Sequence, residues 1–171
     1  NVFEFYKIKK RYKCFFIEDS CHALGAKYSK NKNFKVGNCK FSDIATFSFH
    51  PVKSITTGEG GMVTTSNYEI FKKCQILKNH GIIRKKNTRR KYFWKYQVID
   101  HGFNYRLSDL NCAIGISQLK RLDHFINKRN KIANFYNKIF SDHLDIITLP
   151  KVNKDQKSAW HLYIINIDFD K

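Results

Sequence analysis

A short apolar run, CFFI at residues 14–17, is followed at once by two acids, Glu18 and Asp19. Four apolar residues bounded by polar ones predict a strand that is buried on both faces, as the strands of a parallel sheet are. Residues 44–49 (IATFSF) and 61–66 (GMVTTS) are predicted to be further strands. This pattern restricts the chain to folds that are built around a sheet with a covered parallel strand.

Three stretches have the apolar spacing of helices. Residues 1–12 suit the end of a helix, and residues 67–79 begin with Asn67 as an N-cap. Residues 107–140 hold the longest helical pattern, with Ser108 as the cap and apolar residues at three- and four-residue intervals. Helices that alternate with strands predict an α/β architecture.

Two further segments complete the chain. Residues 84–97 (RKKNTRRKYFWKYQ) are basic and aromatic without a clear period, so we expect a loop or an irregular hairpin there. After Pro150, a polar link leads to residues 160–169 (WHLYIINIDF), which are predicted to form another strand.

The charge balance leaves several classes of partner open. The 32 Lys and Arg residues exceed the 14 Asp and Glu residues, for a formal net charge of +18. Such a chain can bind nucleic acid, an anionic membrane surface or a phosphorylated small molecule. The joint abundance of Lys, Asn, Ile, Phe and Tyr also fits a simpler explanation, an AT-rich coding sequence.

Other compositional features narrow the class of protein. A hydrophobic content of 42% argues against disorder. No apolar run of about 18 residues is present, so no helix is expected to span a membrane. The first residues lack a secretory cleavage site. The chain has five cysteines, an odd number, and no two of them form a C-x-x-C pair. This argues against a disulfide framework and favours a protein of the reducing cytoplasm.

The candidate site residues follow two of the predicted strands. Asp19 stands at the carboxyl end of the first, the edge where open α/β sheets bind ligands, although it also suits a turn at the surface. Ser48 and Lys53 come at and after the end of strand 44–49. A lysine becomes a nucleophile when its amine is partly desolvated, but a solvated surface lysine is the simpler interpretation of Lys53 alone.

The sequence does not support three more specific kinds of site: a nucleotide-binding loop, a catalytic triad and a zinc site. The GEGG turn at residues 58–61 matches neither a P-loop nor a dinucleotide-binding fingerprint. Cys21 and His22 stand beside Asp19, but side chains so close in sequence are expected to diverge, which argues against a local Cys-His-Asp triad. The cysteines and histidines lack the paired spacing of a structural zinc site, so no metal is expected.

The motifs in combination resemble a known family. Residues 18–28 (EDSCHALGAKY) and 36–66 (VGNCKFSDIATFSFHPVKSITTGEGGMVTTS) are similar to the core of the DegT/DnrJ/EryC1/StrS nucleotide-sugar aminotransferases. Residues 101–119 (HGFNYRLSDLNCAIGISQL) resemble the family's G-x-N-x-R segment and helix, and residues 158–165 (SAWHLYII) resemble the strand that opens its small domain. Within the family, the sequences of these motifs are most similar to those of the aminotransferases of the pseudaminic-acid pathway.

The resemblance implies the large domain of a type I pyridoxal 5′-phosphate (PLP) transferase. Residues 1–145 would be the carboxyl-terminal part of that PLP-binding domain, and residues 146–171 the start of a small domain. The family's segment before Cys14, with its phosphate-binding helix N-terminus, is not found. We therefore expect a fragment of a longer protein that alone neither binds the cofactor tightly nor turns over.

The resemblance also implies a role for each site residue. Lys53 would hold PLP as a Schiff base and then act as the base and acid of the proton shift. Asp19 would face the pyridine nitrogen, and His22 would lie beside the cofactor ring. Ser48 would bind the phosphate, and Asn104 would reach the phosphate of the neighbouring subunit in a homodimer.

The implied reaction is a ping-pong transamination. Glutamate would donate the amino group, and a UDP-linked 4-keto-6-deoxy-N-acetylhexosamine would receive it at C4. Neither a nucleic acid nor a membrane is then expected as a partner. A basic nucleic-acid-binding module, based on the charge and on RRKYFWKY at residues 89–96, remains the alternative, as does a non-catalytic sugar-sensing protein on the same fold.

Overall fold

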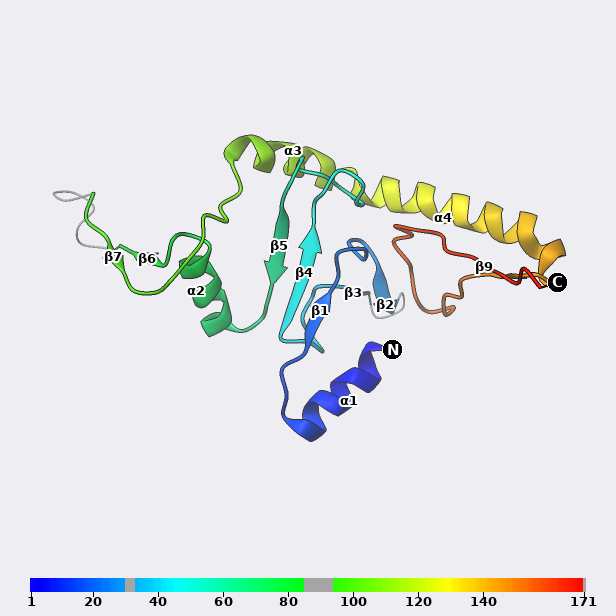
Figure 1. Cartoon of the computed structure of the whole chain (residues 1–171), viewed down its shortest axis with the longest axis horizontal. Coiled ribbons are helices and arrows are strands. Elements are labelled where there is room, and N and C mark those ends of the chain that lie inside the picture. The colour runs from blue at the N-terminus through cyan, green and yellow to red at the C-terminus, as the bar shows by residue number, and fades with distance from the viewer. Residues whose placement is uncertain (30–32, 85–93, 171) are drawn as a thin grey trace.

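A three-stranded sheet forms the centre of the chain (Figure 1). The computed structural model describes residues 1–29, 33–84 and 94–170. The sheet has the order β1 (Ile17–Asp19), β4 (Ile44–Ser48) and β5 (Gly61–Thr64). β1 and β4 are parallel, with Asp19 opposite Thr46, whereas β4 and β5 are antiparallel. With helices around this sheet, the predicted α/β architecture is confirmed.

The predicted helices are present, and their caps are those expected. They are α1 (Val2–Tyr12), α2 (Tyr68–Leu77), α3 (Asp109–Leu119), α4 (Leu122–Ile139) and the 3-10 turn η2 (Phe140–His143). Asn67 accepts hydrogen bonds from the backbone of Glu69 and Ile70, and Ser108 accepts one from Asn111. Each cap therefore satisfies amide donors that a helix start leaves unpaired.

The helical pattern predicted over residues 107–140 folds as two helices, because the chain breaks between α3 and α4. Arg121 has φ −101° and ψ 0°, and its amide donates to the carbonyl of Gln118 at 3.0 Å. A bond to the third preceding residue tightens the helix end, and α4 begins at the next residue, Leu122. The apolar period runs through the break, which is why the sequence did not reveal it.

Three two-stranded ladders flank the main sheet. They pair β2 (Lys27–Ser29) with β3 (Phe34–Lys35), β6 (Ile82–Ile83) with β7 (Gln97–Val98), and β8 (Ile147–Thr148) with β9 (Asn166–Ile167). Only residues 166–167 of the strand predicted at 160–169 are paired. Of the loop or hairpin predicted at 84–97, residues 85–93 lie outside the described residues.

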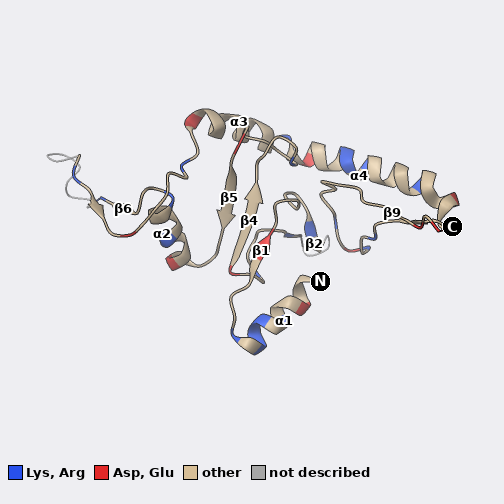
Figure 2. Ribbon diagram, in the orientation of Figure 1, with Lys and Arg blue, Asp and Glu red and all other residues tan. Residues whose placement is uncertain are grey.

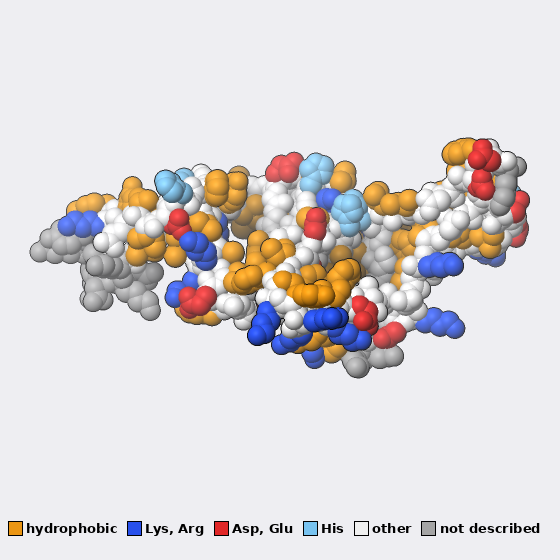
Figure 3. Space-filling view, turned by 60° about the horizontal axis from the view of Figure 1, so that its bottom comes forward, with side chains coloured by type: hydrophobic (Ala, Val, Ile, Leu, Met, Phe, Trp, Pro, Cys, Tyr) orange, Lys and Arg blue, Asp and Glu red, His pale blue; other side chains and the backbone are white. Residues whose placement is uncertain are grey.

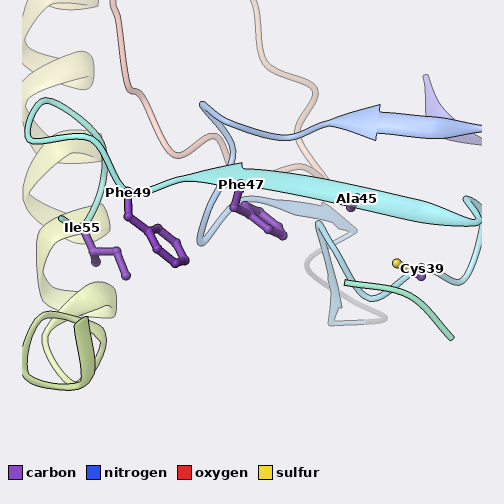
Figure 4. Packing of buried hydrophobic residues seen from close by; sticks show 5 residues of the cluster. All are labelled: Cys39, Ala45, Phe47, Phe49 and Ile55. Atoms are coloured by element: carbon purple, nitrogen blue, oxygen red, sulfur yellow. The ribbon is translucent and has the colours of Figure 1, made fainter. Parts of the chain in front are cut away.

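The core lies on one face of β4. Ala45 and Phe47 alternate with half-buried neighbours along the strand, and they join Cys39, Phe49 and Ile55 in one buried cluster (Figure 4). A second cluster brings α4 against the sheet layer through Ile126, with Ala26 and Ala159. The two clusters fix α4 and the segment around Ala159 relative to the carboxyl end of β4.

The strand expected to be buried is instead exposed. β1 begins at Ile17 rather than Cys14, and the side chains of Phe15 and Ile17 are 75% and 58% exposed. β1 stands at the edge of the sheet, so only β4 pairs with it among the described strands. None of the helices in the described part of the chain is long and apolar enough to cross a membrane.

Candidate active site

The carboxyl ends of β1 and β4 meet at one edge of the sheet because the two strands are parallel. Asp19 is the last residue of β1 and Ser48 the last of β4. Lys53 follows in the turn that leads to β5. Two strands that are remote in sequence therefore deliver a carboxylate, a hydroxyl and an amine to one edge, the position at which open α/β sheets bind ligands.

The turn that carries Lys53 is folded back onto the sheet. The amide of Phe49 donates to Gly60 at 2.8 Å, and the amide of Thr57 donates to Phe49 at 3.0 Å. Lys53 itself donates its amide to His50 at 3.0 Å and is half-buried. The backbone of the turn is thus held by hydrogen bonds on both sides of Lys53, which limits where its amine can lie.

Steric crowding explains why a glycine is needed where this turn enters β5. A Cβ at Gly61 would lie 2.6 Å from the backbone oxygen of Phe47, closer than real Cβ atoms approach. Gly61 pairs directly with Ser48 in the β4–β5 ladder. A larger residue would therefore separate the two strands at the end that bears Ser48.

Asp19 is exposed, although it ends the strand that was expected to be buried. Its carboxylate accepts a hydrogen bond from the amide of Cys21 at 3.1 Å. The Cys21 thiol and the Cys21 amide lower the pKa of Asp19, helped by the nearby charges of His22 and Lys53 and opposed by burial. Asp19 is therefore a carboxylate near neutral pH, and Lys53 lies close enough to act on it.

The thiol of Cys21 contacts this carboxylate. Its hydrogen bond to Asp19, partial burial and the negative charge of Asp19 raise the pKa of the Cys21 thiol, against smaller effects of Thr46 and Lys53. The side chains of Asp19 and Cys21 therefore do not diverge, contrary to the expectation from sequence. A thiol with a raised pKa is protonated at neutral pH and is a poor nucleophile.

His22 joins the site to a distant segment. Its ring lies against the ring of His161, with centroids 4.1 Å apart and planes at 47°. Burial, His22, Lys53 and Arg129 lower the pKa of His161. Sequence reasoning assigned no role to His161, although it stands in the quoted stretch SAWHLYII, because no local pattern links it to His22.

The two remaining predicted residues occupy different places. Ser48 is half-buried, and its hydroxyl accepts a hydrogen bond from the amide of His50 at 3.4 Å, within the Lys53 turn. Asn104 is exposed and pairs with Asn79, just beyond α2, in an isolated β-bridge. The structure thus brings Asp19, His22 and Lys53 together and places Asn104 beside the end of α2.

Comparison with known proteins identifies the family. The model of the DegT/DnrJ/EryC1/StrS aminotransferase family matches residues 1–171.

The chain belongs to this family.

Its relatives include a UDP-4-amino-4,6-dideoxy-N-acetyl-beta-L-altrosamine transaminase of Campylobacter jejuni, which is 46% identical over 95% of this chain and 40% of the relative. The chain therefore spans about two fifths of the length of the curated relatives that it matches.

Solved structures agree in fold. Helicobacter pylori PseC, an aminotransferase involved in the biosynthesis of pseudoaminic acid, has a TM-score of 0.87 and 35% identity, over 99% of this chain and 43% of PseC. Spr1654 of Streptococcus pneumoniae, in its PLP form, has a TM-score of 0.75 and 29% identity, over 90% and 37% of the two chains. The predicted fold, a type I PLP-dependent transferase, is confirmed.

Aminotransferases of the DegT/DnrJ/EryC1/StrS family depend on PLP, and the residues at the sheet edge fit this cofactor. An ionised carboxylate, Asp19, suits a protonated pyridine nitrogen, and a half-buried amine, Lys53, suits an aldehyde carbon. His22 offers a flat ring beside them. These side chains are thus chemically suited to the ring of PLP.

Proposed function

We propose that the full-length protein transfers the amino group of glutamate to C4 of a UDP-linked 4-keto-6-deoxy-N-acetylhexosamine, in the synthesis of a surface glycan. The observation that carries this proposal is the placement of Asp19 at the end of β1 and of Lys53 in the turn after β4, at the edge where these parallel strands end together. The sugar and its nucleotide follow from the transaminase relatives, 46% and 44% identical to this chain.

Each residue has a chemical task in this reaction. PLP, when bound, supplies an electron sink for the substrate carbon that loses a proton. The Lys53 amine binds PLP and then carries that proton. Asp19 stays ionised and holds a proton on the pyridine nitrogen. His22 orients the ring, and the Ser48 hydroxyl donates to the phosphate.

The assembly of the protein is part of the proposal. Asn104 reaches the phosphate at the site of the second subunit in a homodimer, consistent with its exposure and its place beside α2. Residues 1–145 belong to the large PLP-binding domain, and residues 146–171 begin a small domain, since β8 and β9 form a ladder separate from the main sheet. The free cysteines of the described chain suit a cytoplasmic enzyme.

The described charges give no support to the nucleic-acid alternative, and residues 85–93, which carry most of its basic and aromatic motif, lie outside the described residues. Among the described residues, Lys and Arg lie on α1, α2, α4 and several loops rather than along one stripe (Figure 2). A nucleic-acid-binding surface gathers its cations on one face. Steep salt-dependent DNA binding by a full-length protein that binds no PLP would reverse this preference.

Replacement of Lys53 tests the function directly. The full-length Lys53→Ala protein is expected to lose the visible absorbance band of lysine-bound PLP and glutamate-dependent amination of the keto-sugar, because Lys53 is the lysine that acts on Asp19 among the described residues. Lys72→Ala is a matched control, since Lys72 is half exposed on α2, where it pairs with Glu69 and lies over the ring of Tyr68. A parent protein without the band, or a Lys53→Ala protein that keeps both properties, contradicts the proposal.

A further inference from the structure

A ring contact joins the Lys53 site to the segment that follows β8. His22 comes directly after β1, whereas His161 stands in residues 157–163, which return toward β2 beneath α4 (Figure 1). The two imidazole rings lie 4.1 Å apart between centroids. A residue from the proposed small domain therefore touches a residue that the proposed function places against the cofactor ring.

His161 is held in place by α4. One guanidinium nitrogen of Arg129 donates to the carbonyl of Trp160 at 3.0 Å and to the carbonyl of His161 at 3.3 Å. Asn130, the next residue of the helix, donates to the carbonyl of Ser158 at 3.0 Å. Two consecutive side chains of α4 thus bind three carbonyls of a segment that has no strand partner at these positions.

The backbone of this segment is also strained. Trp160 has a φ of 48°, in the left-handed region that bulky residues rarely adopt. Such a conformation costs of the order of 1–3 kcal/mol and persists only where surrounding contacts enforce it. Ala159, the preceding residue, is 2% exposed, so the chain is anchored at the point where it turns. The turn directs His161 toward His22.

The charges around His161 favour its neutral form. Its pKa is lowered by burial first and then by His22, Lys53 and Arg129. Its Nδ1 atom is buried and has no hydrogen-bond partner among the described residues. A proton on Nδ1 would be a buried donor without an acceptor, which places the proton of neutral His161 on Nε2. His161 therefore adds no positive charge beside Lys53.

We propose that His161 is a positioning residue that fixes the ring of His22 and, through it, the orientation of the PLP ring. This inference rests on the proposed function, because His22 needs a cofactor ring to orient. The alternative is that His161 only fills space between α4 and β2. A space-filling residue would affect stability, whereas a positioning residue affects the cofactor and does so only while His22 is present.

A double-mutant cycle in the full-length protein separates the two roles. Apo protein is reconstituted with PLP, and affinity is measured from the visible absorbance and circular dichroism of the bound cofactor. His161→Ala is expected to weaken PLP binding about tenfold, in the range of coupling between contacting residues. In a His22→Ala background, the same change is expected to have no further effect.

Two more variants define what His161 contributes. His161→Phe keeps a flat ring against His22 and is expected to restore most of the affinity. Tyr163→Phe is the matched control, because Tyr163 lies in the same segment as His161 and its hydroxyl donates to Asn137 of α4. This variant is expected to bind PLP as the parent does. In the cofactor-free protein, the imidazole resonances of His22 should shift in His161→Ala and not in Tyr163→Phe.

The outcomes distinguish this inference from the proposed function. If the parent binds PLP but His161→Ala binds it equally well, only the inference is overturned. It is also overturned if the effects of the His22 and His161 changes add, or if His161→Phe is as weak as His161→Ala. A parent that binds no PLP overturns the proposed function as well, whatever the His22 resonances do.

Discussion

Asp19 combines exposure to solvent with a lowered pKa, and local geometry explains both. The thiol and amide of Cys21 donate to the carboxylate, and His22 and Lys53 add positive charge nearby. An aspartate ordinarily titrates near pH 3.9, so Asp19 remains ionised at any pH above about 4. Its charge is available to a cationic ligand ring without a change of protonation.

Removal of this charge is expected to reduce the rate. In the full-length protein, Asp19→Asn keeps the size of the side chain but no longer stabilises a protonated pyridine nitrogen, so kcat for amination should fall about 10²- to 10³-fold. The matched control is Asp100→Asn, since Asp100 is another carboxyl whose pKa is lowered, in this case by Lys73 and the amide of His101. Equal turnover by Asp19→Asn and the parent would show that Asp19 does not face the cofactor.

The site residues differ in how far the sequence reveals them. Asp19 ends one apolar strand and Lys53 lies in the turn that follows another, so the sequence alone predicts that both reach one sheet edge. His161 follows no such pattern, because its place depends on Arg129 and on the left-handed Trp160. Long-range packing fixes its position, and no local sequence signal encodes that packing.

At the scale of elements, α1 is tied to the sheet by one ion pair. Lys9 lies 2.7 Å from Asp43, and both side chains are about one fifth exposed. Asp43 also accepts a hydrogen bond from the amide of Phe16 at 2.9 Å, just before β1. Burial raises the pKa of Asp43, but Lys9 and the Phe16 amide outweigh it, so the pKa is lowered overall.

Asp43→Asn is therefore expected to loosen α1. The free energy of opening of α1, measured by hydrogen exchange in the full-length protein, should fall by about 1–2 kcal/mol at pH 6. Because the folded-state pKa is lowered, this contribution is complete above the unfolded pKa of about 3.9 and is lost as the pH falls through the folded value. The parent and the variant should converge there.

Glu4→Gln provides the control for this measurement. Glu4 pairs with Lys7 on the same helix, but the two side chains are 57% and 72% exposed, and exposed pairs contribute little. No change in the opening of α1 is expected. An effect as large as that of Asp43→Asn would mean that helix charge, rather than the tie to Asp43, holds α1.

Elements with local signals were predictable, and those that depend on neighbours were not. Asn67 and Ser108 mark their helices because a cap is made within four residues. The exposure of Ile17 was not predictable, because burial of an apolar strand depends on which strands and helices flank it. Only the end of the strand expected at 160–169 forms, for a similar reason, since Arg129 of α4 binds the carbonyls of Trp160 and His161.

The whole chain exposes much apolar surface. Hydrophobic side chains gather over the middle of one face (Figure 3). Large side chains that are at least 70% exposed include Phe15, Tyr105, Leu110 and Phe169. Apolar surface on this scale marks places where other protein is expected to pack. This agrees with a chain that spans about two fifths of the length of its relatives.

The 171 residues on their own are accordingly expected to bind PLP far more weakly than the full-length protein and to show no amination. The PLP phosphate would lack the helix N-terminus that the family resemblance places outside this chain. Titration of both proteins with PLP, followed by visible absorbance, provides the comparison. Sustained glutamate-dependent amination by the 171-residue chain would contradict this expectation.

The pairing of Arg129 with two successive carbonyls makes the length of α4 matter. Each residue of an α-helix advances the direction of the side chains by about 100°. A one-residue insertion or deletion between Leu122 and Arg129 would therefore rotate the guanidinium away from Trp160 and His161 while leaving every residue near Lys53 unchanged. The number of residues in this part of α4 therefore determines the position of the His161 imidazole. A change in chain length there can disturb the Lys53 site as much as a substitution next to Lys53.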